Sequence, residues 1–465
     1  MLKGIRRKGL YILAIILILV LAGCEKNTDN ATETGTNMES GADSTINSSG
    51  QTSEEATNSM IPTPTTTPTA VPVSITKERP KTDFRAVKPS VANWSMLRIT
   101  PNKLEEANMW GDAYDFRLAD LAWLDLSEEA EGMKNIVFDT FTTWPDKLPK
   151  GFDPEAVMET GKNPGLGIRS LHEKGITGKG VNIAIIDQML LLQHQEYASR
   201  IKLYEQGNGD MTASMHGPFV ASLSVGKDIG VAPDAGLYFI GTYNFNMLGG
   251  KMELDFTHYA DAIDRIREIN AGLPKEEKIR AISISACWSP GNKGYEELTE
   301  AIERVKQEGV FVISCNMFEN YGFWQYSLDK EPGTDPDKEE SYRSIEWGRW
   351  IDEVSHIEGF PKYFQDQFSK DFMGEFLLVP TGSRTYAEAT GEDVYCFSRL
   401  GGWSAMEPYM AGLYAMACQV KPDITPELFW KTALETGAVR EVTRGGNQYP
   451  ARMLNPVALI EKLQQ

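Results

Sequence analysis

Short apolar runs alternate with amphipathic segments from about residue 161 onward. The runs lie at residues 181–186, 237–240, 282–287, 310–315 and 376–379. Between them, apolar residues recur at helical spacing, most clearly at Tyr259, Ile263, Ile266 and Ile269 and at Tyr295, Leu298, Ile302 and Val305. Strands that are apolar without alternation are buried on both faces, as in a parallel sheet covered by helices. We therefore predict an α/β fold with a doubly wound, mainly parallel sheet over residues 161–465.

The same pattern predicts where the sheet carries its function and where a late helix lies. In open parallel sheets, ligands bind outside the carboxyl ends of the strands. Thr425 and Pro426 are typical of an N-cap and first helical turn, and Gly437 is typical of the residue that ends such a helix. Residues 84–160 hold several tryptophans with apolar residues between them, which predicts a folded N-terminal extension. The pattern leaves open whether this extension is a cap, a pro-segment or part of the main domain.

The first 83 residues differ from the rest in composition. Lys3, Arg6, Arg7 and Lys8 precede an apolar run at 10–19, and a Leu-Ala-Gly-Cys sequence ends at Cys24. A charged start, a short apolar run and small residues before a cut predict an export signal at 1–23. Residues 24–83 are rich in Ser, Thr, Asn, Gly and Pro, which predicts a disordered tether because they can bury little apolar surface.

The charge of the chain limits its classes of partner, and its cysteines and acidic residues bear on disulfides and metal binding. The chain has 65 acidic and 46 basic residues and a net charge of −19, which argues against nucleic acid because a phosphate backbone needs a basic surface. The four cysteines after Cys24 could form disulfides in an exported protein, but three of them lie in apolar stretches, which favours buried thiols. We predict no metal, although the acidic run 335–340 could hold calcium. A solvated acidic loop is the simpler interpretation of this run.

Three places in the sequence carry residues that could take part in a chemical reaction. Asp187 ends the apolar run that follows a Gly-Lys-Gly turn. His216 and Gly217 open a small-residue stretch, and a Gly-Val-Ala-Pro sequence follows at 230–233. Ser404 follows two glycines and precedes an Ala- and Met-rich helix, so it lies at a helix start, where backbone N–H groups favour negative charge. Taken singly, these residues are typical of a strand-end turn, a structural histidine and a helix cap.

Together and in this order, the three motifs resemble those of the subtilisin-like serine proteases, over roughly Pro164 to Thr436. Gly-Val-Ala-Pro follows the histidine motif in that family as it does here. The serine motif of the family matches at Gly402, Ser404, Pro408, Ala411 and Gly412. The family's oxyanion asparagine follows an apolar strand, and Asn316 is the corresponding residue. The Leu-Ala-Gly-Cys sequence similarly resembles a bacterial lipobox, which implies lipidation of Cys24 and a membrane-anchored protein that faces outside the cytoplasm.

The resemblance implies a mechanism for peptide hydrolysis. Ser404 would attack the scissile carbonyl, His216 would take its proton, and Asp187 would orient the histidine. Asn316 and the backbone N–H of Ser404 would donate to the oxyanion. The segment from Ser283 to Ser285 would pair with an extended peptide or protein substrate, which requires a free sheet edge.

The motifs also depart from the family pattern around these residues. Pro218 and Phe219 replace a Thr and a second His, Trp403 replaces the Thr before the nucleophile, and Glu407 replaces a Ser. Cys315 replaces the Gly before the oxyanion asparagine. These departures keep a second hypothesis open, a catalytically weak or inactive pseudoprotease that binds peptides or a surface partner. A solute-binding lipoprotein is a third, which the tether and the acidity fit but which has no use for the His216 and Ser404 motifs.

Overall fold

A computed structural model describes residues 79–110, 113–248, 251–344, 375–444 and 447–465. Residues 81–465 belong to one compact unit. The predicted export signal, Cys24 and nearly all of the predicted tether lie outside the described residues. None of the described helices is long and apolar enough to cross a membrane.

The central sheet is parallel throughout and has the strand order β10-β9-β4-β6-β5. Its strands are β4 (Asn182–Asp187), β5 (Ile201–Gln206), β6 (Gly236–Gly241), β9 (Ile279–Ile284) and β10 (Phe311–Ser314). Four of these strands lie at four of the apolar runs, so the prediction of an α/β fold with a parallel sheet is confirmed. The apolar character of these runs follows from burial, because β4, β6 and β10 are buried at every residue.

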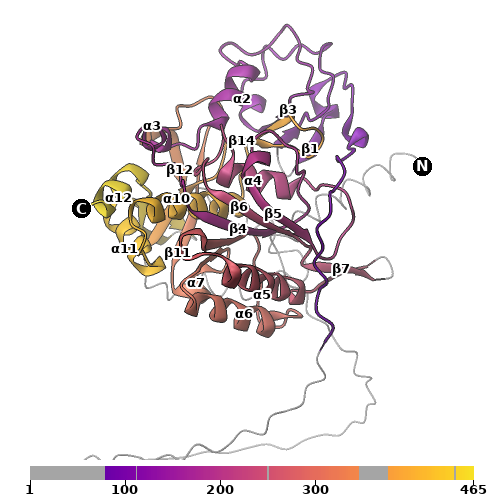
Figure 1. The fold of residues 1–465 in the computed structure, drawn as a ribbon. Coiled ribbons are helices and arrows are strands. Elements are labelled where there is room, and N and C mark those ends of the chain that lie inside the picture. The colour runs from indigo at the N-terminus through magenta and orange to yellow at the C-terminus, as the bar shows by residue number, and fades with distance from the viewer. Residues whose placement is uncertain (1–78, 111–112, 249–250, 345–374, 445–446) are drawn as a thin grey trace, which may run out of the picture. The chain divides into compact units, whose positions relative to one another are not determined.

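Helices cover both faces of this sheet (Figure 1). On β4, Ile183 and Ile185 belong to the apolar core that includes α4 (His216–Val225) and α10 (Met406–Val420). Ala184 and Ile186 alternate with them and belong to the core under α5 (Thr257–Gly272) and α6 (Tyr295–Gln307). Alternate residues of one strand thus enter two separate cores, which explains why an unbroken apolar run forms a strand here.

A second sheet has the order β12-β11-β13-β17-β16. It consists of β11 (Trp324–Lys330), β12 (Tyr342–Ser344), β13 (Phe376–Pro380), β16 (Ala438–Arg444) and β17 (Asn447–Met453). The fifth apolar run forms β13, but β13 pairs in parallel with β11 and β17 and not with the central sheet. The prediction of one sheet was wrong for this run because burial between two neighbours gives a strand the same sequence pattern in either sheet.

The third sheet joins the N-terminal extension to the C-terminal half of the chain. Its order is β1-β2-β3-β15-β14, with β1 (Asn108–Trp110), β2 (Ala113–Asp115), β3 (Ile136–Asp139), β14 (Arg384–Ala387) and β15 (Tyr395–Ser398). In the middle of this sheet, β3 pairs with β15 in antiparallel register, so that Phe138 lies opposite Phe397. The extension is therefore packed into the same compact unit as the rest of residues 81–465.

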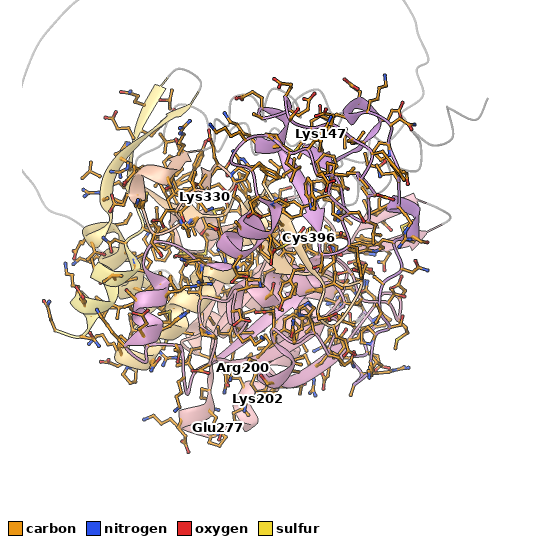
Figure 2. The ribbon with its side chains drawn as sticks, turned by 90° about the horizontal axis from the view of Figure 1, so that it is seen from above. Lys147, Arg200, Lys202, Glu277, Lys330 and Cys396 are labelled. Atoms are coloured by element: carbon orange, nitrogen blue, oxygen red, sulfur yellow. The ribbon has the colours of Figure 1, made fainter. Side chains whose placement is uncertain are left out.

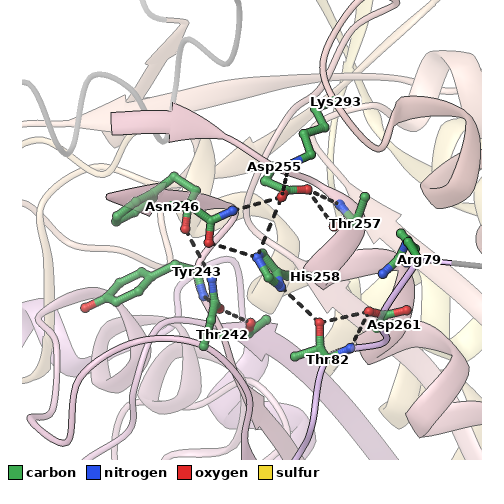
Figure 3. A network of polar contacts seen from close by, with 12 residues as sticks. Arg79, Thr82, Thr242, Tyr243, Asn246, Asp255, Thr257, His258, Asp261 and Lys293 are labelled. Carbon is green, nitrogen blue, oxygen red and sulfur yellow. Dashed lines mark hydrogen bonds and ion pairs between the residues drawn. The ribbon is translucent and has the colours of Figure 1, made fainter. Parts of the chain in front are cut away.

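The segment that leads into the extension lies along the edge strand β5. Arg85 exchanges two backbone hydrogen bonds with Gln206, at 2.8 and 2.9 Å. A polar network fixes the start of this segment to α5 (Figure 3). The Thr82 N–H and hydroxyl both donate to Asp261, and His258 contacts the Thr82 hydroxyl with one ring nitrogen and Asn246 with the other.

The remaining helices and turns connect these sheets. The helices are α2 (Pro154–Lys162), α3 (Ile168–Glu173), α7 (Met317–Tyr321), α11 (Pro426–Thr436) and α12 (Pro456–Leu463). A hairpin consists of β7 (Phe245–Leu248) and β8 (Lys251–Leu254), and the short turns are η1 (Ser95–Leu97), η2 (Leu104–Glu106), η3 (Gly132–Lys134), η4 (Ala198–Arg200), η5 (Lys275–Glu277), η6 (Glu339–Ser341) and η7 (Trp403–Ala405). As predicted, Thr425 caps α11 by accepting a hydrogen bond from the Leu428 N–H, and Gly437 follows its last residue.

Candidate active site

Three neighbouring strands of the central sheet end beside one another in chemically useful residues. Asp187 is the last residue of β4, Ser285 follows β9, and Asn316 lies two residues after β10. Because these strands are parallel, their carboxyl ends meet at one edge of the sheet. The structure thus brings Asp187 and Asn316 to the same edge, where the sequence motifs put them.

Asp187 and His216 form a buried hydrogen-bonded pair. The Oδ1 atom of Asp187 lies 2.6 Å from Nδ1 of His216, and the two residues are 2% and 3% exposed. The same oxygen accepts a hydrogen bond from the Gln188 N–H at 2.7 Å. The other ring nitrogen of His216, Nε2, is buried and has no hydrogen-bond partner in the described part of the chain. A histidine held this way has one nitrogen oriented by a carboxylate and one available to take a proton.

Helix α4 positions His216 as its first residue, and close packing fixes the helix. Gly217 lies so near the backbone after β4 that a Cβ atom there would be 2.5 Å from the Gln188 carbonyl oxygen. A glycine is therefore required for α4 to begin this close to Asp187. Phe219 packs its ring 5.6 Å from the His216 ring and 4.8 Å from that of Tyr386.

Ser404 lies in the turn η7 that leads directly into α10. Gly402 precedes the turn with a φ of 60°, a conformation that favours glycine. The Ser404 residue is 7% exposed, and its carbonyl accepts a hydrogen bond from the Ser285 hydroxyl at 3.0 Å. Turn η7 contacts α4, the helix that carries His216. Among the described residues His216 Nε2 has no hydrogen-bond partner, so the Ser404 hydroxyl does not bond to it in this conformation.

Asn316 does not offer a free donor. Its Oδ1 atom accepts a hydrogen bond from the Trp288 N–H at 3.0 Å, and its Nδ2 atom donates to the Trp288 carbonyl at 2.8 Å. The Nδ2 atom donates a second time, to the carboxylate of Glu319. Both amide hydrogens are therefore engaged, which differs from the arrangement that an oxyanion donor needs. Sequence reasoning missed Glu319, although its position three residues after Asn316 on one helical turn could have indicated the contact.

The geometry also corrects the expectation for Ser283. This residue lies between Ile185 of β4 and Ile313 of β10, paired on both sides, and it is fully buried. Strand addition needs an unpaired edge, and Ser283 has none. Ser285 lies beyond the paired residues, but its hydroxyl is engaged with Ser404.

A buried carboxyl group links α10 to the strand that leads to Asn316. Glu407 is fully buried on α10, and its Oε1 atom accepts a hydrogen bond from Gln325 Nε2 at 2.8 Å. The same Gln325 nitrogen donates to the Ser314 carbonyl at 3.3 Å, at the end of β10. Burial raises the pKa of Glu407 to about 8, so this side chain is mostly protonated at neutral pH. A single glutamate in an apolar helix was the only sequence signal for this contact.

The N-terminal extension reaches the same region through Arg117. This side chain is 2% exposed, forms an ion pair with Asp115 at 2.8 Å, and lies over the rings of Trp94 and Trp110. Its Nη1 atom also lies 3.3 Å from the sulfur of Met215, the residue before His216. Sequence reasoning did not find this contact, because nothing in the pattern of the extension relates it to the histidine motif.

The described residues contain no group of three or more His, Cys, Asp or Glu side chains arranged to hold a metal ion. In the acidic run, Asp337 accepts hydrogen bonds from Asn163 Nδ2 and from the Gly167 N–H, both at 2.8 Å, and so connects the run to the loop before α3. The cysteines at 287, 315, 396 and 418 remain as thiols. The aromatic residues at 321–326 pack against the core and are half-buried except for Tyr326, which is buried. Phe323 stacks on Trp430 with the ring centroids 4.6 Å apart.

The chain matches no protein-family model and no curated protein. Among solved structures it is similar to the prenylagaramide maturation protease PagA, with 15% sequence identity and a TM-score of 0.43. The likeness covers 64% of this chain and 99% of that one. A likeness of this size does not assign an activity to the chain.

Proposed function

We propose that this protein is a subtilisin-like serine endopeptidase that cleaves peptide bonds with Ser404, His216 and Asp187. The observation that supports the proposal most is the 2.6 Å hydrogen bond between Asp187 and His216, with Nε2 of His216 buried and without a partner in the part of the chain that the structure describes. Such a pair can serve as a general base for a neighbouring hydroxyl. Turn η7, which contacts the helix of His216, supplies the hydroxyl of Ser404.

In the proposed reaction, Ser404 Oγ attacks the scissile carbonyl carbon while His216 Nε2 takes the hydroxyl proton. The imidazolium that forms is stabilised by Asp187 and then gives the proton to the leaving amine. Water repeats the sequence on the acyl-enzyme and releases Ser404. The Ser404 hydroxyl first has to come within hydrogen-bond reach of Nε2, because the two are not hydrogen-bonded in this conformation.

A fluorophosphonate probe tests this proposal directly, because it reacts only with an activated serine. The mature chain would carry Cys24→Ser so that it stays in solution, and peptide mapping would locate the label. We expect labelling at Ser404 that disappears in Ser404→Ala. A folded protein that stays unlabelled over hours and across pH would refute an activated nucleophile.

One observation favours a second candidate, a pseudoprotease that binds peptides without cleaving them. Both amide hydrogens of Asn316 are engaged, so this conformation lacks the side-chain donor that the oxyanion requires. Peptide binding with no labelling of Ser404 would support this candidate.

We also propose that the chain is anchored outside the cytoplasm through a lipid on Cys24. The proposal rests on the charged and apolar leader and on the Leu-Ala-Gly-Cys sequence. Metabolic labelling with a radioactive fatty acid would show incorporation into the wild-type chain and none into Cys24→Ser. Equal incorporation into both would overturn it.

A further inference from the structure

The amide group of Asn316 has no hydrogen left for a substrate. An amide nitrogen carries two hydrogens, and those of Asn316 go to the Trp288 carbonyl and to the Glu319 carboxylate. The tetrahedral intermediate of peptide hydrolysis carries an oxyanion that needs such a donor at the moment the charge develops. One of the two present acceptors must therefore release Asn316 before this residue can take part in the reaction.

The two acceptors are held very differently. Asn316 binds Trp288 through two hydrogen bonds, one to its N–H and one to its carbonyl, and Trp288 is 1% exposed. Breaking that contact would leave buried backbone groups without partners, which is costly. Glu319 is an exposed residue on the short helix α7, and water can solvate its carboxylate once it lets go. Glu319 is therefore the acceptor that can be displaced.

The charge of Glu319 opposes the oxyanion as well. A carboxylate bonded to Nδ2 stands within one hydrogen-bond length of the nitrogen that the oxyanion would approach. Two negative groups that share one donor in a partly buried site repel each other. Glu319 thus takes up the donor and adds an unfavourable charge at the same place.

We propose that Glu319 is an inhibitory positioning residue, which competes with the oxyanion for the side-chain N–H of Asn316 and holds the site in a slow state. The inference rests on the proposed function, since it assigns a role within that reaction. The oxyanion can bind Asn316 only after the Glu319 carboxylate has been displaced. Separating Glu319 from Asn316 costs free energy, which reduces the stabilisation of the transition state.

Replacing Glu319 should accelerate the enzyme, which few substitutions near an active site do. The fluorophosphonate reaction serves as the assay, because its transition state also places negative charge on an oxygen near the donors. We expect Glu319→Ala to raise the maximal labelling rate of Ser404 by about tenfold, the equivalent of one hydrogen bond. The probe concentration at half-maximal rate should change little, because the competition concerns the transition state and not probe binding. Glu319→Gln, which keeps an acceptor but no charge, should give a smaller increase.

Two further variants separate this role from a structural one. In an Asn316→Ala background, Glu319→Ala should give no increase, because the donor is gone. Glu297→Ala removes an exposed glutamate on α6 and should leave the labelling rate unchanged. A labelling rate for Glu319→Ala at or below that of the wild type, or an equal increase without Asn316, would overturn the proposal.

Nuclear magnetic resonance of the Asn316 side-chain amide gives a readout that needs no activity. Its two proton signals can be assigned by their loss in Asn316→Asp. Glu319→Ala should move one of them upfield and speed its exchange with water, because a charged acceptor has been removed. Unchanged signals would contradict the contact and overturn the proposal. A shifted signal with no labelling of any variant would refute the protease and leave the Asn316–Glu319 hydrogen bond as a structural contact only.

Discussion

The two halves of the candidate site differ in how ready they are for chemistry. On one side, Asp187 holds His216 through a 2.6 Å hydrogen bond, and no described residue bonds to Nε2. On the other side, every hydrogen-bonding atom of the Asn316 amide is engaged by Trp288 or Glu319. The base half, which consists of Asp187 and His216, is therefore preorganised. In the donor half, which consists of Asn316 and the residues bonded to it, other groups of the protein already occupy the amide. A motif match alone therefore does not establish activity, because each half of a catalytic site has to be available at the same time.

The largest effect is expected in the base half. Asp187→Asn keeps the size of the side chain but favours the wrong tautomer of His216, so we expect the labelling rate of Ser404 to fall by about 10⁴-fold. The unfolding transition in urea should move little. Asp146→Asn, at an exposed position, is the matched control and should retain the wild-type labelling rate. A loss of less than tenfold would show that Asp187 does not orient a catalytic base.

The next largest effect concerns the support that the extension gives to the base half. Arg117→Met leaves Asp115 as an uncompensated buried charge and removes the contact with Met215, so the free energy of unfolding should fall by about 3–5 kcal/mol. Urea denaturation measures the change.

The control for Arg117 is a surface cation of the same extension. Lys147→Met breaks an exposed ion pair with Asp125 and should shift the transition far less. Figure 2 shows Lys147 near the periphery and Cys396 in the interior. Equal effects of Arg117→Met and Lys147→Met would mean that the buried pair gives the base half no special support.

The free energy of unfolding should depend on pH through Glu407, the buried carboxyl group that connects α10 to the end of β10 through Gln325. Burial raises the pKa of Glu407 from its ordinary value of 4.5 to about 8. Between these two values the folded state holds a proton that the unfolded state has lost, so stability falls as pH rises, by about 1.4 kcal/mol per pH unit, and levels off above about pH 8.

Glu407→Gln should remove the contribution of Glu407 to the fall in the free energy of unfolding with pH, as measured by urea denaturation between pH 5 and pH 8. Glu388 is a second fully buried glutamate, on which the charge of Arg117 acts; burial raises its pKa to about 8 as well, so it contributes a slope of the same sign. Glu388→Gln should therefore remove a second part. An unchanged slope in Glu407→Gln would show that this carboxyl group is not buried in protonated form.

The smallest effect should come from the contact between Ser285 and the turn of Ser404. Ser285→Ala removes one hydrogen bond to the Ser404 carbonyl, and we expect a loss of about 1 kcal/mol in the free energy of unfolding. Ser95→Ala, at an exposed position, is the control and should be neutral. If Ser285→Ala is also neutral, the position of Ser404 depends on α10 alone.

Sequence patterns predicted the central sheet well because burial on two faces leaves a clear trace. Four of the five apolar runs became strands of that sheet, and the helices at 257–272 and 295–307 follow the predicted spacing. The fifth run, β13, was assigned to the wrong sheet, since an apolar run reports burial and not which strand lies beside it.

The candidate site was predictable only in part. The order of the motifs indicated Asp187 and His216, and their hydrogen bond is present in the structure. The engagement of Asn316 by Glu319, and that of Gln325 by Glu407, depends on side-chain directions that no spacing rule gives. The contact of Arg117 with Met215 joins residues 98 positions apart, and only the folded chain brings them together.

The pairing of β3 with β15 has a consequence for how the chain acquires its structure. Hydrogen bonds beside these strands join Thr140 and Tyr395, which are 255 residues apart. Such a loop has a large closure entropy, and non-local strand pairing of this kind slows folding. Since synthesis starts at the N-terminus, β3 and its neighbour β2 are made long before β15, and one edge of β3 has to wait without its partner strand. The third sheet can therefore be completed only after the C-terminal half of the chain has been made.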